Sequence, residues 1–380
     1  MKRAILIVLD GCGAGEAPDA AEFNDRDHPA TIKHVWDAAG PLNLPNLQAC
    51  GFLSACKVDI PVGAPAGGFG VQYGRLRELS KGKDSVTGHW EMMGIVTESP
   101  FPTYPNGFPP HLVRTFETRI GVEVIGNKAA SGTEIIAELG PEHVRTGKPI
   151  LYTSADSVFQ VACHEEIVPI ERLYEICSIG REVCVSPDNV QRIIARPFVG
   201  DAAQGFVRTG RRKDFPLEAP PNLVDAIGGV YGIGPVPDLF GGRGFLPMPR
   251  TQNNSEHEQE LWRALDFDAR FIFANFEDFD MLYGHRNDPA GFAKALIRFD
   301  ETLGQLLKRM GPEDLLLLTA DHGNDPTTIS TDHSREYVPI CATGLGLRSK
   351  PLGDIDGMSA LGATVAAHLG VDWGVGTAIQ

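Results

Sequence analysis

The chain has 380 residues, of which 42% are hydrophobic and 22% charged, and its formal net charge is −15. This length predicts two domains, or one domain with a large insertion, and the apolar content is enough for a sizeable core. The negative charge argues against nucleic acid or an anionic membrane surface as a partner, so any attraction for a phosphate must come from local metals and arginines.

The first predicted element is a strand over residues 4–9, an apolar run that ends at Asp10. Such a run is typical of a buried strand in a parallel sheet, and it is too short for the apolar core of a signal peptide or for a membrane span. Gly11, Gly13 and Gly15 follow without the spacing of a dinucleotide-binding fingerprint. A carboxylate at the end of a strand favours metal binding over nucleotide binding here.

Residues 81–94 gather lysine, aspartate, hydroxyl and imidazole side chains in one short segment. A hydroxyl beside a metal ion can ionise and attack phosphorus, which makes Ser85 and Thr87 candidate nucleophiles. The alternative is that Asp84 or Ser85 only caps a helix. On this segment alone, capping is the favoured interpretation.

The composition changes at about residue 98, where a proline-rich stretch begins, and a second such stretch covers residues 216–221. Between them the pattern of strand, helix and strand predicts a small α/β module. The strand at residues 192–200 carries Arg196, and more basic residues cluster from Arg208 onward. We therefore expect a core domain in two parts, residues 1–97 and 221–380, with this small α/β module inserted at residues 98–220.

Residues 271–276 predict another buried strand, and Asp280 and His285 follow it. The two side chains are five positions apart, which does not stack them on one face of a helix. A loop can still bring both to one ion. Residues 290–310 then form the clearest amphipathic helix in the chain.

The third strand, at residues 315–318, leads directly into Asp321 and His322, and His333 lies eleven residues beyond His322. Open α/β sheets place their ligands just beyond the carboxyl ends of their strands. One carboxylate and two imidazoles in so short a segment suit a divalent metal with nitrogen and oxygen ligands.

Three predicted strands of one mostly parallel sheet thus each end in potential metal ligands. Six ligands are too many for one zinc ion and about right for two ions that share a nucleophile. The alternative gives each residue a separate structural role, as a cap, a buried pair or a surface group. The six residues are Asp10, Asp280, His285, Asp321, His322 and His333.

Over nearly its whole length the chain resembles the phosphopentomutases of the alkaline-phosphatase superfamily. The motifs that carry the resemblance are EAPDA at 16–20, GKDSVTGHWE at 82–91, YTSADSVFQ at 152–160, ARPF at 195–198, DFD at 278–280, GHR at 284–286, TADHG at 319–323 and TDH at 331–333. The resemblance implies an alkaline-phosphatase-like α/β core, with a central mostly parallel sheet flanked by helices, and an inserted small α/β cap domain.

The resemblance also implies two manganese ions, with Zn²⁺ or Mg²⁺ as alternatives. One ion is held by Asp10, Asp321, His322 and the nucleophile, and the other by Asp280, His285 and His333. The family's nucleophile is normally a threonine, and Ser85 stands at that position here, with Thr87 as the second candidate.

The implied reaction interconverts ribose 1-phosphate and ribose 5-phosphate, or the deoxy sugars, through phosphorylated Ser85, with a sugar bisphosphate as activator. The cap is implied to contact the phosphosugar through Ser154, Asp156, Arg196 and Arg208. No obligate protein partner is evident. The seven cysteines, an odd number without a Cys-x-x-Cys pair, favour reduced thiols and a cytoplasmic location.

A position besides Ser85 also departs from the family pattern. Where the family usually has a lysine in a Gly-Lys-Ile stretch that reaches substrate phosphate, this chain has Pro235 after Gly234. An alternative therefore stays open: a mutase or phosphatase of the same superfamily that acts on a different phosphosugar.

Overall fold

The computed structural model describes residues 2–154 and 157–379. The chain divides into two compact units, one formed by Met1–Ser99 with Ala219–Gln380 and the other by Pro100–Glu218. The first is called the core unit below and the second the inserted unit. Among the described residues, no helix has the length and apolarity that crossing a membrane requires.

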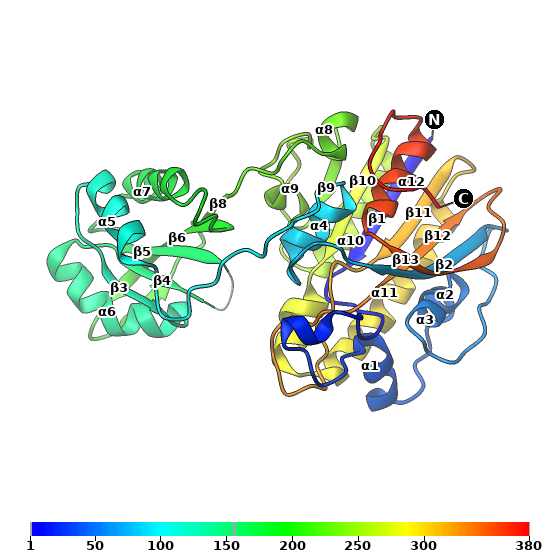
Figure 1. Ribbon diagram of the computed structural model, residues 1–380, viewed down its shortest axis with the longest axis horizontal. Helices are drawn as coiled ribbons and strands as arrows, with labels where there is room; N and C mark the ends of the chain where they lie inside the picture. Colours follow the sequence, from blue (N-terminus) through cyan, green and yellow to red (C-terminus); the bar gives the residue numbers. More distant parts are fainter. Residues whose placement is uncertain (1, 155–156, 380) are drawn as a thin grey trace. The chain divides into compact units, whose positions relative to one another are not determined.

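The core unit contains a seven-stranded sheet in the order β13-β2-β12-β11-β1-β10-β9 (Figure 1). Its strands are β1 Arg3–Leu9, β2 Gly70–Arg77, β9 Tyr231–Ile233, β10 Phe271–Phe276, β11 Asp314–Thr319, β12 Val338–Gly344 and β13 Lys350–Asp356. The four strands β11, β1, β10 and β9 are mutually parallel, and only β12 runs against its neighbours. The mostly parallel sheet predicted from the apolar runs is confirmed.

Helices cover both faces of this sheet. His89 of α4 (Ser85–Met92) stacks on Phe273, whereas Phe299 of α11 (Pro289–Arg309) contacts Phe276, three residues along the same strand. Successive side chains of a strand point to opposite faces, so α4 and α11 lie on opposite sides. The other α-helices of this unit are α1 Thr31–Ala39, α2 Pro45–Ala49, α3 Phe52–Ala55, α8 Leu223–Ile227, α9 Val236–Leu239, α10 Asn254–Asp266 and α12 Ser359–Leu369. Short helices of other types are η1 Ala20–Phe23, η2 Phe279–Tyr283 and η3 Gly284–Arg286, and the last two carry Asp280 and His285.

The inserted unit has its own sheet, in the order β3-β4-β5-β6-β7 with β8 paired to β6. Its elements are α5 Pro110–Ile120, β3 Ile125–Ala129, α6 Gly132–Thr146, β4 Ile150–Thr153, β5 Val158–His164, α7 Ile170–Val183, β6 Arg192–Asp201, β7 Gly205–Arg208 and β8 Lys213–Pro216. Two apolar clusters, one around Phe116 and Phe159 and one around Ile135 and Phe198, give this unit a separate core. The predicted α/β fold class is confirmed.

Candidate active site

The candidate ligands meet at one edge of the core sheet because β1, β10 and β11 run parallel and end together. Leu9 pairs with Phe276, and Val8 pairs with Thr319, so the segments that follow these strands are neighbours. Asp10 and Asp321 are both buried there. This is the edge at which parallel sheets bind their ligands.

The first ligand group is Asp10, Asp321 and His322, whose ligand atoms lie within 4.8 Å of one another. His322 Nε2 is 3.5 Å from Asp10 Oδ1 and 3.4 Å from Asp321 Oδ2. Among the described residues neither oxygen has a hydrogen-bond partner, although both are buried. Buried carboxylate oxygens are rarely left without a partner, so this donor set suits a cation.

The electrostatics of the first group agree with a cation. Burial, and then the neighbouring carboxylates of Asp321 and Asp280, raise the pKa of Asp10 well above its ordinary value. Burial also lowers the pKa of His322, which favours the neutral imidazole that binds metals. A bound cation would offset the repulsion among these carboxylates.

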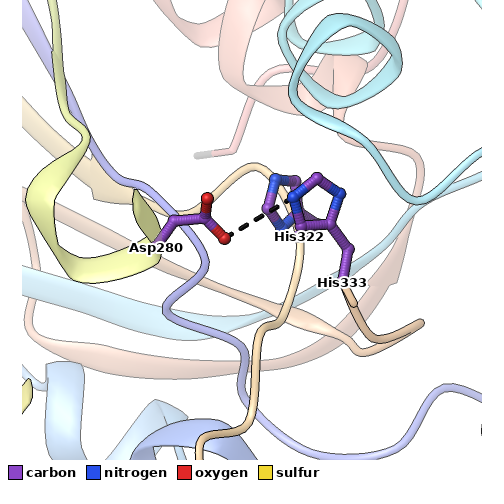
Figure 2. A group of neighbouring side chains, drawn as sticks. All are labelled: Asp280, His322 and His333. Carbon is purple, nitrogen blue, oxygen red and sulfur yellow. Dashed lines mark ion pairs between the residues drawn. The ribbon is translucent and has the colours of Figure 1, made fainter. Parts of the chain in front are cut away.

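The second ligand group is formed by Asp280, His285 and His333, and His322 lies close to Asp280 and His333. His285 Nε2 is 3.0 Å from Asp280 Oδ2, and His333 Nε2 is 3.6 Å from Asp280 Oδ1. Figure 2 shows the Asp280 carboxylate directed at the imidazoles of His322 and His333, and the ligand atoms of these three residues lie within 4.8 Å of one another. His322 thus belongs to both groups.

Polar residues outside the ligand set fix the ligands in place. Asn275 Nδ2 donates to Asp10 Oδ2 and Asn324 Nδ2 donates to Asp280 Oδ1, each over 2.6 Å. His285 Nδ1 is 2.6 Å from the carbonyl oxygen of Thr331, which directs its Nε2 toward Asp280. Neither asparagine was predicted from the sequence, where the only signal is an amide side chain close to the end of an apolar strand.

Ser85 is the first residue of α4 and lies against the ligand groups, with its Oγ 3.2 Å from His322 Nε2. The helix is capped by the preceding Asp84, whose side chain accepts hydrogen bonds from the amides of Val86 and Thr87. The buried Thr87 hydroxyl accepts a hydrogen bond from the Asp84 amide, which completes the capping box, and it donates back to Asp84. Asp84 and Thr87 therefore take the capping roles, and the Ser85 hydroxyl faces the ligands.

The substrate residues predicted for the cap lie in the inserted unit, except that Asp156 lies outside the described residues. Ser154 follows β4 and Arg208 ends β7. Arg196 donates from Nε to Gln160 over 3.0 Å. Burial, and then the neighbouring Arg212, lower the pKa of Arg196, as expected where cations gather around a place suited to an anion.

Comparison with known proteins identifies the family. Phosphopentomutases from Symbiobacterium thermophilum and Dictyoglomus thermophilum are 48% and 50% identical to this chain, and each match covers 98% of the chain and 95% of the relative. The chain belongs to the phosphopentomutase family. Residues 244–373 also match the sequence model of the Metalloenzyme superfamily. This match, the membership of the phosphopentomutase family and the two ligand groups together support an enzyme that uses divalent metal ions.

Solved structures agree with the fold. The PH0037 protein from Pyrococcus horikoshii aligns over 99% of both chains with a TM-score of 0.51 and 18% sequence identity. At this identity the similarity concerns the fold alone.

Proposed function

We propose that the chain is an isomerase that interconverts ribose 1-phosphate and ribose 5-phosphate, or their deoxy forms, through a phosphorylated Ser85. The observation that carries the proposal is the position of the Ser85 hydroxyl, 3.2 Å from the one imidazole, that of His322, common to both ligand groups. Membership of the phosphopentomutase family supports the choice of substrate.

Six side chains would hold two divalent ions, for which we propose manganese, with zinc and magnesium as alternatives. Asp10, Asp321 and His322 would share one ion with Ser85, while Asp280, His285 and His333 would hold the other. When bound, the ions lower the pKa of a hydroxyl ligand and neutralise charge on a transferring phosphoryl group.

The helix α4 contributes directly to phosphoryl transfer. Its amino terminus carries a partial positive charge, which would stabilise a phosphoryl group on Ser85, the first residue of the helix. Phospho-Ser85 would transfer its phosphoryl group to the free hydroxyl of the sugar phosphate, which releases its proton and becomes a sugar bisphosphate. The other phosphate then returns to Ser85, and a sugar bisphosphate from outside would supply the first phosphoryl group.

We propose that the inserted unit is the cap domain and binds the phosphosugar. The planar, forked guanidinium groups of Arg196 and Arg208 suit a phosphate, and Ser154 and Asp156 would accept or donate hydrogen bonds to the sugar. We also propose a cytoplasmic location, supported by seven cysteines that are all free and buried.

The test is turnover of ribose 5-phosphate with Mn²⁺ and a trace of sugar bisphosphate, with ribose 1-phosphate and free phosphate measured together. We expect isomerisation to exceed phosphate release by far. Equal rates of both would instead support a phosphatase. Preferential turnover of a hexose phosphate would support the alternative substrate, which Pro235 at the position of the family's lysine favours.

A further inference from the structure

The end of β9 lies at the rim of the core sheet, two strands from Asp10. Ile233 pairs with Ala274, so Gly234 reaches the level of Asn275, and a Cβ on Gly234 would lie 2.5 Å from the Asn275 carbonyl oxygen. Asn275 is in turn bonded to Asp10. At Pro235 the chain turns into the short helix α9. No cationic side chain can therefore extend toward the metal ligands from this position.

A buried histidine occupies the space beside this turn. His257 of α10 is fully buried, and its Nδ1 lies 2.7 Å from Thr251 Oγ1, which also accepts a hydrogen bond of 3.2 Å from the Gly234 amide. His257 Nε2 would lie 3.2 Å from a Cβ on Gly234, so the glycine leaves room for the ring. Thr251 thus fixes the ring and directs Nε2 to the end of β10.

The group that faces His257 Nε2 is the carboxylate of Glu277, with Oε1 at 3.6 Å. Among the described residues Nε2 has no hydrogen-bond partner, although it is buried. A carboxylate can only accept hydrogen bonds, so this arrangement favours the imidazole tautomer with its proton on Nε2, directed at Glu277. This separation is within ion-pair range and slightly longer than a hydrogen bond.

Glu277 immediately follows β10, and its side chain is 23% exposed. It is close enough to Asp10 to help raise the pKa of that residue, after the larger effects of burial, Asp321 and Asp280. Glu277 is not among the metal ligands, so its negative charge is not offset by the ions and repels a phosphate group. It attracts the hydroxyl groups of a neutral sugar ring, because its two oxygens can accept from two neighbouring O–H groups.

We propose that Glu277, oriented by His257, binds vicinal hydroxyl groups of the pentose, so that this part of the rim recognises the sugar and not its phosphate. The inference rests on the proposed function and specifies the substrate class further. A carboxylate on ribose hydroxyls is the same chemistry that dinucleotide sites use. It also accounts for Pro235, since no phosphate then needs a cation at this position.

The test compares ribose 5-phosphate with 2-deoxyribose 5-phosphate in the wild type, Glu277→Ala and Glu277→Asp. We expect the wild type to prefer the ribose compound. In Glu277→Ala the KM for ribose 5-phosphate should rise about tenfold and that for the deoxy compound about threefold or less, which removes the preference. Glu277→Asp should restore part of the preference for ribose 5-phosphate. His257→Gln should reduce this preference, but less than Glu277→Ala does.

The matched control is Glu301→Gln, which removes an exposed carboxylate paired with Arg298 on α11 and should change neither KM. Bound manganese and the phosphorylation of Ser85 are measured in every variant by elemental analysis and intact mass. An equal loss for both sugars in Glu277→Ala, or lost manganese, would overturn the inference. If the wild type turns over neither pentose phosphate, the proposed function itself fails, and the inference falls with it.

Discussion

The Thr31 hydroxyl donates a hydrogen bond of 2.6 Å to the carboxylate of Glu336, inside the core unit. The same carboxylate accepts hydrogen bonds from the amides of Thr31 and Gly15 and from the Ser334 hydroxyl. It therefore ties the loop that follows Asp10 to the segment that carries His333. One buried acid thus connects parts of the chain that hold different ligand groups.

The first prediction concerns the titration of this acid. Burial raises the pKa of Glu336 from 4.5 to about 7, although its hydrogen bonds with Thr31 and Gly15 oppose the shift. An acid whose pKa is higher in the folded chain contributes stability below its unfolded pKa and loses this contribution as the pH rises through its folded pKa. The stabilising contribution of Glu336 is therefore lost between about pH 4.5 and pH 7, and the free energy of unfolding falls by about 3 kcal/mol over this range.

Urea unfolding of metal-free wild type and Glu336→Gln at about pH 5 and about pH 7.5 measures this effect, because other titrating groups cancel in the difference. The free energy of unfolding of the wild type should fall relative to that of the variant by up to about 3 kcal/mol as the pH rises. A difference that does not change with pH would show that Glu336 titrates normally.

The second prediction concerns the nucleophile. Ser85→Ala should lower kcat at least about a thousandfold, because the covalent route is lost, whereas Ser85→Thr should keep activity since it retains a hydroxyl at the same position. Intact mass after incubation with a sugar bisphosphate should show one added phosphoryl group in the wild type and none in Ser85→Ala. Thr87→Ser, which preserves the capping box, is the control. A phosphorylated Ser85→Ala protein would transfer the role to Thr87.

The third prediction follows from the place of His322 in both ligand groups. Titration of the metal-free protein with Mn²⁺ should give two sites in the wild type. His285→Ala should weaken only the site that His285 ligates. His322→Ala should weaken most the site that it shares with Asp10 and Asp321, and the other site by about tenfold to a hundredfold, because its imidazole also lies beside Asp280 and His333. Equal effects of the two variants on a single site would contradict the shared position of His322. Chelation should abolish turnover and lower Tm, since ligands that bind only the folded chain stabilise it.

The fourth prediction concerns phosphate recognition in the inserted unit. Arg196→Ala should raise KM for ribose 5-phosphate about tenfold to a hundredfold, because a charge-assisted hydrogen bond is worth about 1.5–3 kcal/mol. The control is Arg119→Gln, which removes an exposed arginine of α5 that pairs with Glu182 of α7. It should leave KM unchanged. Unchanged KM in Arg196→Ala would place the phosphate elsewhere.

The strands that carry the ligands could be predicted because their sequences are uninterrupted apolar runs, as in residues 4–9 and 315–318. Their meeting at one edge followed from the parallel arrangement that such runs indicate. The supporting contacts could not be predicted in this way. Asn275 bonds to Asp10 over 265 residues of sequence, and no local periodicity indicates which distant carboxylate an amide will meet.

The segment around Ser85 illustrates the same limit. Sequence reasoning on this segment alone favoured a cap for Asp84 or Ser85, and the structure assigns the cap to Asp84 and Thr87. Two hydroxyls and one carboxylate within four residues offer several equivalent caps. Only the folded chain shows which hydroxyl is left for the ligands: that of Ser85, which lies 3.2 Å from His322, a residue 237 positions away in the sequence.

The first turn of α4 passes so close to the end of β11 that only hydrogen fits at position 88. A Cβ on Gly88 would lie 2.3 Å from the Asp321 carbonyl oxygen. Glycine weakens a helix by about 1 kcal/mol relative to alanine, so α4 is less stable here than its length allows. Alanine at this position would strengthen the isolated helix, yet it would force α4 from the backbone at Asp321, which costs stability in the folded chain and separates Ser85 from His322.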